Sequence, residues 1–95
     1  MKALNNIRVS VIIEGRVQGI FFRANTQSVA LQNNVTGWVK NRFDSSVEAV
    51  FEGKKEDVER VILWCRVGPE GAKVDRVKIT LEDYTGEFNS FSISY

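Results

Sequence analysis

Two hydrophobic periodicities alternate along this chain, and their order limits the possible folds more than any other feature of the sequence. Apolar side chains occupy every second position from Ile7 to Ile13, which predicts a strand with one buried face. After a short glycine-containing loop the spacing changes to that of a helix. The residues that share this helical spacing are Phe22, Thr26, Val29 and Ala30.

The same change of period occurs a second time. Residues 35–41 ("VTGWVKN") and 46–52 ("SVEAVFE") are rich in β-forming residues, and the polar turn "RFDS" separates them, which predicts a hairpin. A second helix is predicted from Lys54 onward, with acidic residues in its first turn. Its apolar stripe consists of Val58, Val61, Ile62 and Cys65.

Two further strands follow the sequence "GPEG", which ends this helix. Their apolar positions are Val74, Val77, Ile79 and Leu81, then Phe91, Ile93 and Tyr95. The order β-α-β-β-α-β with a short extra C-terminal strand predicts an α+β, ferredoxin-like sandwich. Its sheet is expected to be mainly antiparallel and covered on one face by the two helices. At 95 residues the chain is predicted to form one domain, residues 1–95.

This topology predicts where a site would lie. If the first two strands run parallel and the third returns between them, the carboxyl ends of the first two meet at one edge of the sheet. The loop after the first strand and the turn at residues 42–45 then become neighbours. In α/β proteins, ligands usually bind beyond the carboxyl ends of parallel strands.

The loop itself, within "EGRVQGIFFR" at residues 14–23, has features of an anion site. Gly15 and Gly19 permit positive φ, so that successive N–H groups can converge near a helix N-terminus, where anions are favoured. Arg23 is a cation in the first turn of that helix, and a bound anion would compensate this unfavourable placement. Spacing alone leaves a second interpretation open, a plain turn with Arg23 in solvent.

The residue inventory limits the chemistry. The chain has no histidine, no metal-ligand spacing and one cysteine, Cys65, which we interpret as a packing residue. Hydrolysis of ordinary esters or peptides would therefore lack a general base and a leaving-group acid. Phosphoryl transfer depends mainly on positioning and charge stabilisation, and an acyl phosphate has a carboxylate leaving group that needs no acid.

The charge balance and the N-terminal segment indicate which binding partners and which cellular location to expect. Thirteen basic and twelve acidic side chains leave a net charge of +1, which gives no general attraction to nucleic acid or to an anionic membrane. The segment "MKALNNIRVS" lacks the apolar run of a signal peptide. We therefore expect a cytoplasmic monomer with no nucleic-acid or membrane partner.

Together these stretches resemble the acylphosphatase family. "GRVQGIFFR" followed by "GWVKN", with "VEAVFEG" and "VGPEGAKVDRV" further on, match the family's order and spacing over nearly the whole chain. The resemblance implies hydrolysis of the carboxyl–phosphate bond of acyl phosphates without a metal or organic cofactor. It implies that Arg23 binds phosphate and that Asn41 orients the attacking water. The backbone N–H groups that would help Arg23 belong to Arg16, Val17, Gln18, Gly19 and Ile20.

Other conspicuous residues have plainer interpretations. The side chain of Gln18 braces the loop or faces solvent, and that of Arg16 steers anions or is a solvated loop charge, so neither side chain is assigned to catalysis. Phe21, Phe22 and Trp38 could form an aromatic wall beside the acyl group, but core packing is the preferred interpretation for Phe22 and Trp38.

One position departs from the family pattern, and one other functional class stays open. The family usually has glycine in the hairpin turn where this chain has Ser45. The alternative function is a non-catalytic ferredoxin-like module that binds an anion or RNA. The strand at residues 46–52 lacks spaced aromatic residues, which argues against an RNA reader.

Overall fold

The computed structural model describes residues 5–95, and its elements follow the order expected from the sequence. They are β1 (Asn6–Arg16), α1 (Phe22–Gln32), β2 (Thr36–Asn41), β3 (Val47–Lys54), α2 (Lys55–Val67), β4 (Lys73–Glu82) and β5 (Phe91–Ile93). The final strand ends at Ile93, so its predicted extension to Tyr95 is wrong. Residues 1–4, at the start of the N-terminal segment that lacks a signal-peptide pattern, lie outside the described residues.

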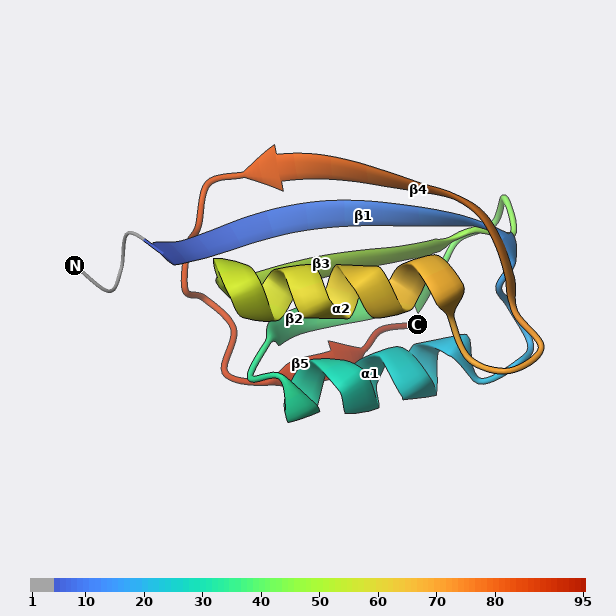
Figure 1. Cartoon of the computed structure of the whole chain (residues 1–95), viewed down its shortest axis with the longest axis horizontal. Coiled ribbons are helices and arrows are strands. Elements are labelled where there is room, and N and C mark those ends of the chain that lie inside the picture. The colour runs from blue at the N-terminus through green and yellow to red at the C-terminus, as the bar shows by residue number, and fades with distance from the viewer. Residues whose placement is uncertain (1–4) are drawn as a thin grey trace.

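The strands form one mixed sheet in the order β4-β1-β3-β2-β5. β3 is antiparallel to both β1 and β2, so these two strands run parallel to each other, as expected. β4 adds to β1 antiparallel, and β5 adds to β2 parallel. The carboxyl ends of β1 and β2 therefore meet at one end of the sheet, on the right of Figure 1.

Both helices cover the same face of the sheet (Figure 1). The core between these layers is built from the predicted apolar stripes. Its buried residues include Val9, Val11, Ile13, Phe22, Ala30, Val39, Val47, Ala49, Phe51, Val58, Val61, Cys65 and Phe91. The ferredoxin-like fold class is thus confirmed. Neither α1 nor α2, the helices of residues 5–95, is long and apolar enough to cross a membrane.

Trp38 is not part of this core, which corrects the prediction made for it. Its neighbours in β2, Gly37 and Val39, are buried, while Trp38 is only half-buried. Because side chains alternate along a strand, Trp38 faces away from the helices. There its ring lies 5.5 Å from Lys40 Nζ.

Gly15 marks an irregularity in the pairing of β1 with β4, one residue before the strand ends at Arg16. The register between β1 and β4 shifts between Glu14 and Gly15, which is a bulge. Gly15 has a φ of 132°, and a Cβ at this position would lie 2.1 Å from the carbonyl oxygen of Lys73. Only glycine fits this close approach of two backbones.

Candidate active site

Residues 17–21 connect the end of β1 to the start of α1 and leave several backbone donors free. Gly19 adopts a positive φ of 79° within this connection. Of the backbone–backbone hydrogen bonds formed outside helices and strands in residues 5–95, none is donated by residues 17–20. Because folded chains pair nearly all backbone donors with protein or water, this loop can offer N–H groups to an anion near the helix N-terminus.

Phe21, the residue before α1, is held in a left-handed conformation. Its φ is 62° and its ψ is 26°, which costs a bulky residue about 1 kcal/mol. The carbonyl oxygen of Phe21 accepts hydrogen bonds from Asn25 N, at 3.0 Å, and from Asn25 Nδ2, at 2.9 Å. The ring is 79% exposed, so burial of the side chain does not explain the strain. Strain of this kind tends to occur at functional sites.

Arg23 is the second residue of α1, and its side chain is half-buried. The first turn of α1 contains no acidic residue. In the ion pairs of residues 5–95, no carboxylate lies within 4.0 Å of its guanidinium. The guanidinium lies over the Tyr95 ring, whose centroid is 5.0 Å from Arg23 Cζ. The positive end of the helix dipole and this cation thus lie together without an internal anion.

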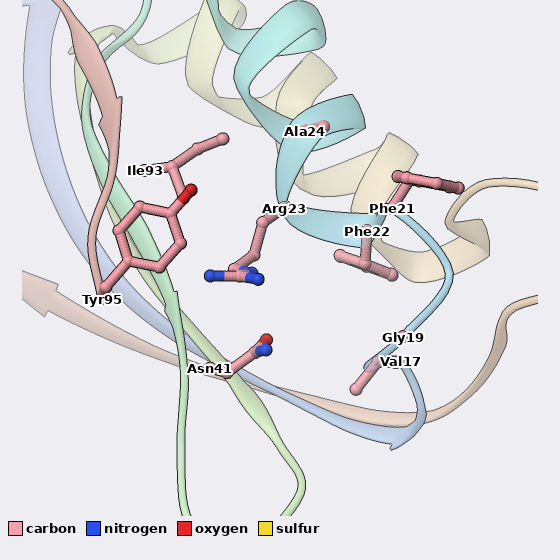
Figure 2. A pocket seen from close by; sticks show the side chains of 9 residues that line it. All are labelled: Val17, Gly19, Phe21, Phe22, Arg23, Ala24, Asn41, Ile93 and Tyr95. Carbon is pink, nitrogen blue, oxygen red and sulfur yellow. The ribbon is translucent and has the colours of Figure 1, made fainter.

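Asn41 ends β2 and faces the same cavity as Arg23. This cavity, here called the Arg23 pocket, has a volume of about 330 Å³. Its lining consists of Val17, Gly19, Phe21, Phe22, Arg23, Ala24, Asn41, Ile93 and Tyr95. In Figure 2 the side chains of Arg23 and Asn41 both extend toward its centre from different elements. The meeting of the β1 loop with the end of β2, expected from topology, is confirmed.

Gln18 joins the loop to the hairpin between β2 and β3. Its Nε2 donates to the carbonyl oxygens of Arg42 and Ser46, at 2.9 Å in each case. The hairpin is further held by the carboxylate of Asp44, which accepts from Ser46 N at 3.1 Å and from Ser46 Oγ at 2.5 Å. These bonds, Ser46 Oγ–H first, lower the pKa of Asp44. The bracing interpretation of Gln18 is therefore confirmed.

The hairpin keeps a left-handed residue at the position where the family usually has glycine. Ser45 has a φ of 77°, and its N–H donates to the carbonyl oxygen of Arg42 at 3.3 Å. Serine thus stands in the left-handed region, which glycine would adopt at lower cost. Asn41, four residues earlier, keeps its place in the Arg23 pocket.

The other predicted residues lie at different depths. Val17 is buried and lines the Arg23 pocket, whereas Ile20 is half-buried and packs against the core. Arg16 is exposed, and its side chain does not line the pocket. Phe22 is a core residue, packed at 5.5 Å against the ring of Trp64, and it also forms part of the pocket wall.

The C-terminal residues form part of the pocket, which was not expected from the sequence. Ile93 and Tyr95 line it, and the Tyr95 ring contacts the guanidinium of Arg23. The strand-like spacing of "FSISY" indicated a strand, but it did not show with which strand of the sheet it would pair. The parallel pairing of β5 with β2, which brings these residues to the site, depends on contacts between distant segments.

Cys65 lies in the core and does not line the Arg23 pocket. Cys65 is fully buried on α2, and burial raises the pKa of its thiol to about 12. It therefore remains a protonated packing residue, as expected. Within residues 5–95, no group of three or more His, Cys, Asp or Glu side chains could hold a metal ion.

The arrangement is suited to a small anion next to a polar amide. The Arg23 guanidinium offers paired donors in one plane, which match phosphate or carboxylate oxygens. The Asn41 amide offers one acceptor oxygen and two N–H donors. The remaining lining residues are apolar, apart from the Tyr95 hydroxyl and the backbone.

Comparison with protein families gives a match over most of the chain. The family model described as acylphosphatase matches residues 9–93. The acylphosphatase of Pelotomaculum thermopropionicum is 46% identical over 92 residues, which cover 97% of this chain and 100% of that protein. That of Syntrophus aciditrophicus is 50% identical over 88 residues, covering 93% and 92%.

Solved structures agree with this match. The crystal structure of an acylphosphatase from Bacillus subtilis has a TM-score of 0.90 at 32% identity, and covers 94% of this chain and 99% of its own. An acylphosphatase structure from Coxiella burnetii has a TM-score of 0.93 at 30% identity, with coverage of 99% and 98%.

Proposed function

Because this chain belongs to the acylphosphatase family of enzymes, we propose that it hydrolyses acyl phosphates to a carboxylate and inorganic phosphate at the Arg23 pocket. The observation that carries the proposal is the half-buried guanidinium of Arg23, which has no ion-pair partner in residues 5–95 and shares its pocket with Asn41. A phosphoryl group would supply the missing negative charge.

In this proposal Arg23 and the loop hold the phosphoryl group. The guanidinium binds two of its oxygens, and the backbone N–H groups of Arg16, Val17, Gln18, Gly19 and Ile20 bind the charge from the loop side. These donors gain strength as charge develops on the phosphoryl oxygens in the transition state. The unpaired N–H groups of residues 17–20 support this role.

Asn41 is proposed to orient the attacking water. The amide oxygen accepts a hydrogen bond from the water, which directs a water lone pair at phosphorus. The new bond joins water oxygen to phosphorus, while the bond from phosphorus to the acyl oxygen breaks and its electron pair leaves with the carboxylate. The proton of the water goes to the phosphate product or to solvent. Since the leaving carboxylate has a conjugate acid of pKa about 4, no general acid is required.

The first test is the hydrolysis of benzoyl phosphate by the purified protein. We expect turnover that neither EDTA nor thiol alkylation changes, since the sequence lacks histidine and Cys65 is buried. Inorganic phosphate should inhibit competitively, because it would occupy the same donors. A strict requirement for Mg²⁺ or Zn²⁺ would contradict the proposed mechanism.

Two variants separate binding from chemistry. Arg23→Ala should lose turnover and also the thermal stabilisation given by added phosphate, about 2.7 kcal/mol at a hundred times Kd. Asn41→Ala should lose most turnover but keep the phosphate-dependent rise in Tm, because Asn41 acts mainly on water. Arg66→Ala, an exposed position in the last turn of α2, is the control for removal of a surface cation.

The outcomes distinguish an enzyme from a protein that binds an anion without catalysis. A parent protein that phosphate stabilises but that turns over no acyl phosphate would be an anion-binding module. An Asn41→Ala variant with full activity would remove Asn41 from the mechanism.

We also propose that the enzyme works as a cytoplasmic monomer without nucleic-acid or membrane partners. Arg23 and Asn41 come from one chain, so the pocket needs no second copy. Light scattering on a sizing column should give a mass near 10.8 kDa. A dimer mass at micromolar concentration would contradict the monomer.

A further inference from the structure

Phe21 has an exposed aromatic ring and a backbone conformation that is unfavourable for a bulky side chain. The residue lies on the rim of the Arg23 pocket, 79% exposed, in a left-handed conformation that a bulky side chain rarely adopts. The ring contributes little to the core, and glycine would relieve the strain. Strain and exposure together indicate that the ring contacts another molecule rather than stabilising the fold.

The position of the ring relative to Asn41 identifies what it would contact. In Figure 2, Asn41 and Phe21 lie on opposite sides of the pocket lining, with the Phe22 side chain between them and Phe21 at the outer edge. In an in-line displacement at phosphorus the attacking and leaving oxygens lie opposite each other. If Asn41 holds the water, the leaving acyl group extends toward Phe21.

The other walls of the pocket indicate the chemistry of that group. Arg23 is the one charged residue among those that line the pocket, and Phe21, Phe22 and Ala24 are apolar. With Arg23 occupied by the phosphoryl group, an acyl group would meet no further charged side chain of the lining. An aromatic or extended apolar acyl group fits these surroundings, and aromatic rings gain further from offset or edge-to-face contact.

We propose that Phe21 is the platform for the acyl group and that it makes this enzyme select acyl phosphates with aromatic or extended apolar acyl groups over acetyl phosphate. This inference rests on the proposed hydrolysis at the Arg23 pocket. It assigns specificity to Phe21 and leaves phosphate binding and water activation to other residues.

The experiment compares kcat/KM for benzoyl phosphate and acetyl phosphate in the parent protein and in Phe21 variants. Phe21→Ala should lower the ratio of the two values about five- to tenfold, the size expected for one lost aromatic contact. Phe21→Gly should lower it equally while raising Tm above that of Phe21→Ala, because glycine tolerates the positive φ. Phe21→Tyr should keep the parent ratio, since it keeps the ring.

The control is Phe43→Ala, which removes another exposed aromatic ring. Phe43 lies on the β2–β3 hairpin with a relative exposure of 112% and does not line the Arg23 pocket. This variant should leave the ratio within twofold of the parent. The inhibition constant of inorganic phosphate should be unchanged in every Phe21 variant, because Arg23 and residues 16–20, the proposed phosphate donors, are unchanged.

The outcomes separate this proposal from the function on which it rests. If the parent protein hydrolyses both substrates and Phe21→Ala keeps the parent ratio of the two kcat/KM values, Phe21 is not the platform for the acyl group. The proposed hydrolysis would still stand. A ratio that falls in Phe21→Tyr as much as in Phe21→Ala would also overturn the platform, since the ring would then not be the cause. If the parent hydrolyses neither substrate, both proposals fail.

Discussion

Arg8 and Arg23 are two half-buried arginines in very different surroundings. Arg8, near the start of β1, donates to Glu82 at 2.8 Å and to Glu52 at 3.2 Å, and lies 3.4 Å from Glu87. Its guanidinium also lies over the Phe88 ring at 5.4 Å. Arg23 has the matching aromatic contact, with Tyr95, but no carboxylate partner in residues 5–95.

Glu52 is the anion that completes the Arg8 region. Its side chain is only 1% exposed, and its carboxylate accepts from Thr85 N at 2.9 Å, Thr85 Oγ1 at 2.9 Å and Gly86 N at 3.0 Å. Burial, the largest single influence, raises its pKa, but the hydrogen bonds from Thr85, Arg8 and Gly86 together outweigh it. The pKa of Glu52 therefore lies below its ordinary value.

The comparison shows what separates a structural network from a ligand site in this molecule. Both regions bring together a guanidinium, an aromatic ring and backbone N–H donors. Around Arg8 the fold supplies the anion itself, and the network fastens residues 83–90 to the sheet. Around Arg23 the same kinds of donor surround a cavity, and in the proposed function the anion there is the phosphoryl group of the substrate.

The same substitution at both arginines should have its largest effect on stability at Arg8. Arg8→Ala leaves Glu52 buried without its cation and should lower the free energy of unfolding by roughly 3 kcal/mol. Arg23→Ala should change it by less than about 0.5 kcal/mol without phosphate, and any gain would come from removing a cation at the helix N-terminus. Urea titration of both variants measures this difference.

The pH dependence of stability provides the control for this comparison. Ionised Glu52, with its lowered pKa, stabilises the fold at pH above its ordinary pKa, and this contribution is lost as the pH falls through the folded-state pKa. In Arg8→Ala the pKa of Glu52 should rise toward its unfolded-state value, so the loss of stability that Glu52 contributes at acid pH should shrink. Equal effects of the two arginine variants on stability at neutral pH would contradict a structural role for Arg8 and a ligand-binding role for Arg23.

A smaller effect is expected from removing the aromatic partner of Arg23. Tyr95→Leu deletes the ring that lies over the guanidinium, and should raise the inhibition constant of inorganic phosphate about two- to fivefold, the size of an exposed cation–π contact. Tyr95→Phe keeps the ring and should bind phosphate like the parent. Tm without phosphate should change little, because Tyr95 is 95% exposed. Unchanged inhibition in Tyr95→Leu would show that Arg23 is positioned without the ring.

The smallest effect is expected at Ser45. Its positive φ costs a serine roughly 1 kcal/mol that glycine would avoid, offset in part by the greater unfolded-state entropy of glycine. Ser45→Gly should therefore be neutral to mildly stabilising in urea. Ser45→Ala, which keeps the strain, is the matched control. A clear loss of stability in Ser45→Gly would indicate an interaction of the serine hydroxyl that outweighs the backbone strain.

Local patterns predicted the elements of this fold well. The alternation in β1 and the stripe on α2 identify buried faces directly, because a side chain's position along a strand or helix fixes which way it points. Arg23 and Asn41 could be brought together from topology, since the parallel relation of β1 and β2 follows from the order of elements. Trp38 was misjudged because aromatic character alone does not tell which face of a strand it occupies.

Contacts made by irregular segments could not be predicted in the same way. The burial of Glu52 depends on the path of residues 83–90, which carry no periodic signal. The contact of Tyr95 with Arg23 depends on the pairing of β5 with β2, and the backbone of Phe21 depends on how the loop enters α1. Each is decided by tertiary packing rather than by the local sequence.

The two hydrogen bonds of Gln18 link the motions of two loops. Its amide bridges the carbonyl oxygens of Arg42 and Ser46, one on each side of the hairpin turn, so the hairpin cannot open locally without disturbing the loop that carries residues 17–20. An anion held by that loop should consequently slow amide hydrogen exchange in the hairpin, at the N–H groups of Arg42 and Ser45, which bond to Ser46 and Arg42. Binding of an anion in the pocket would then increase the hydrogen-exchange protection of amides that do not contact the ligand.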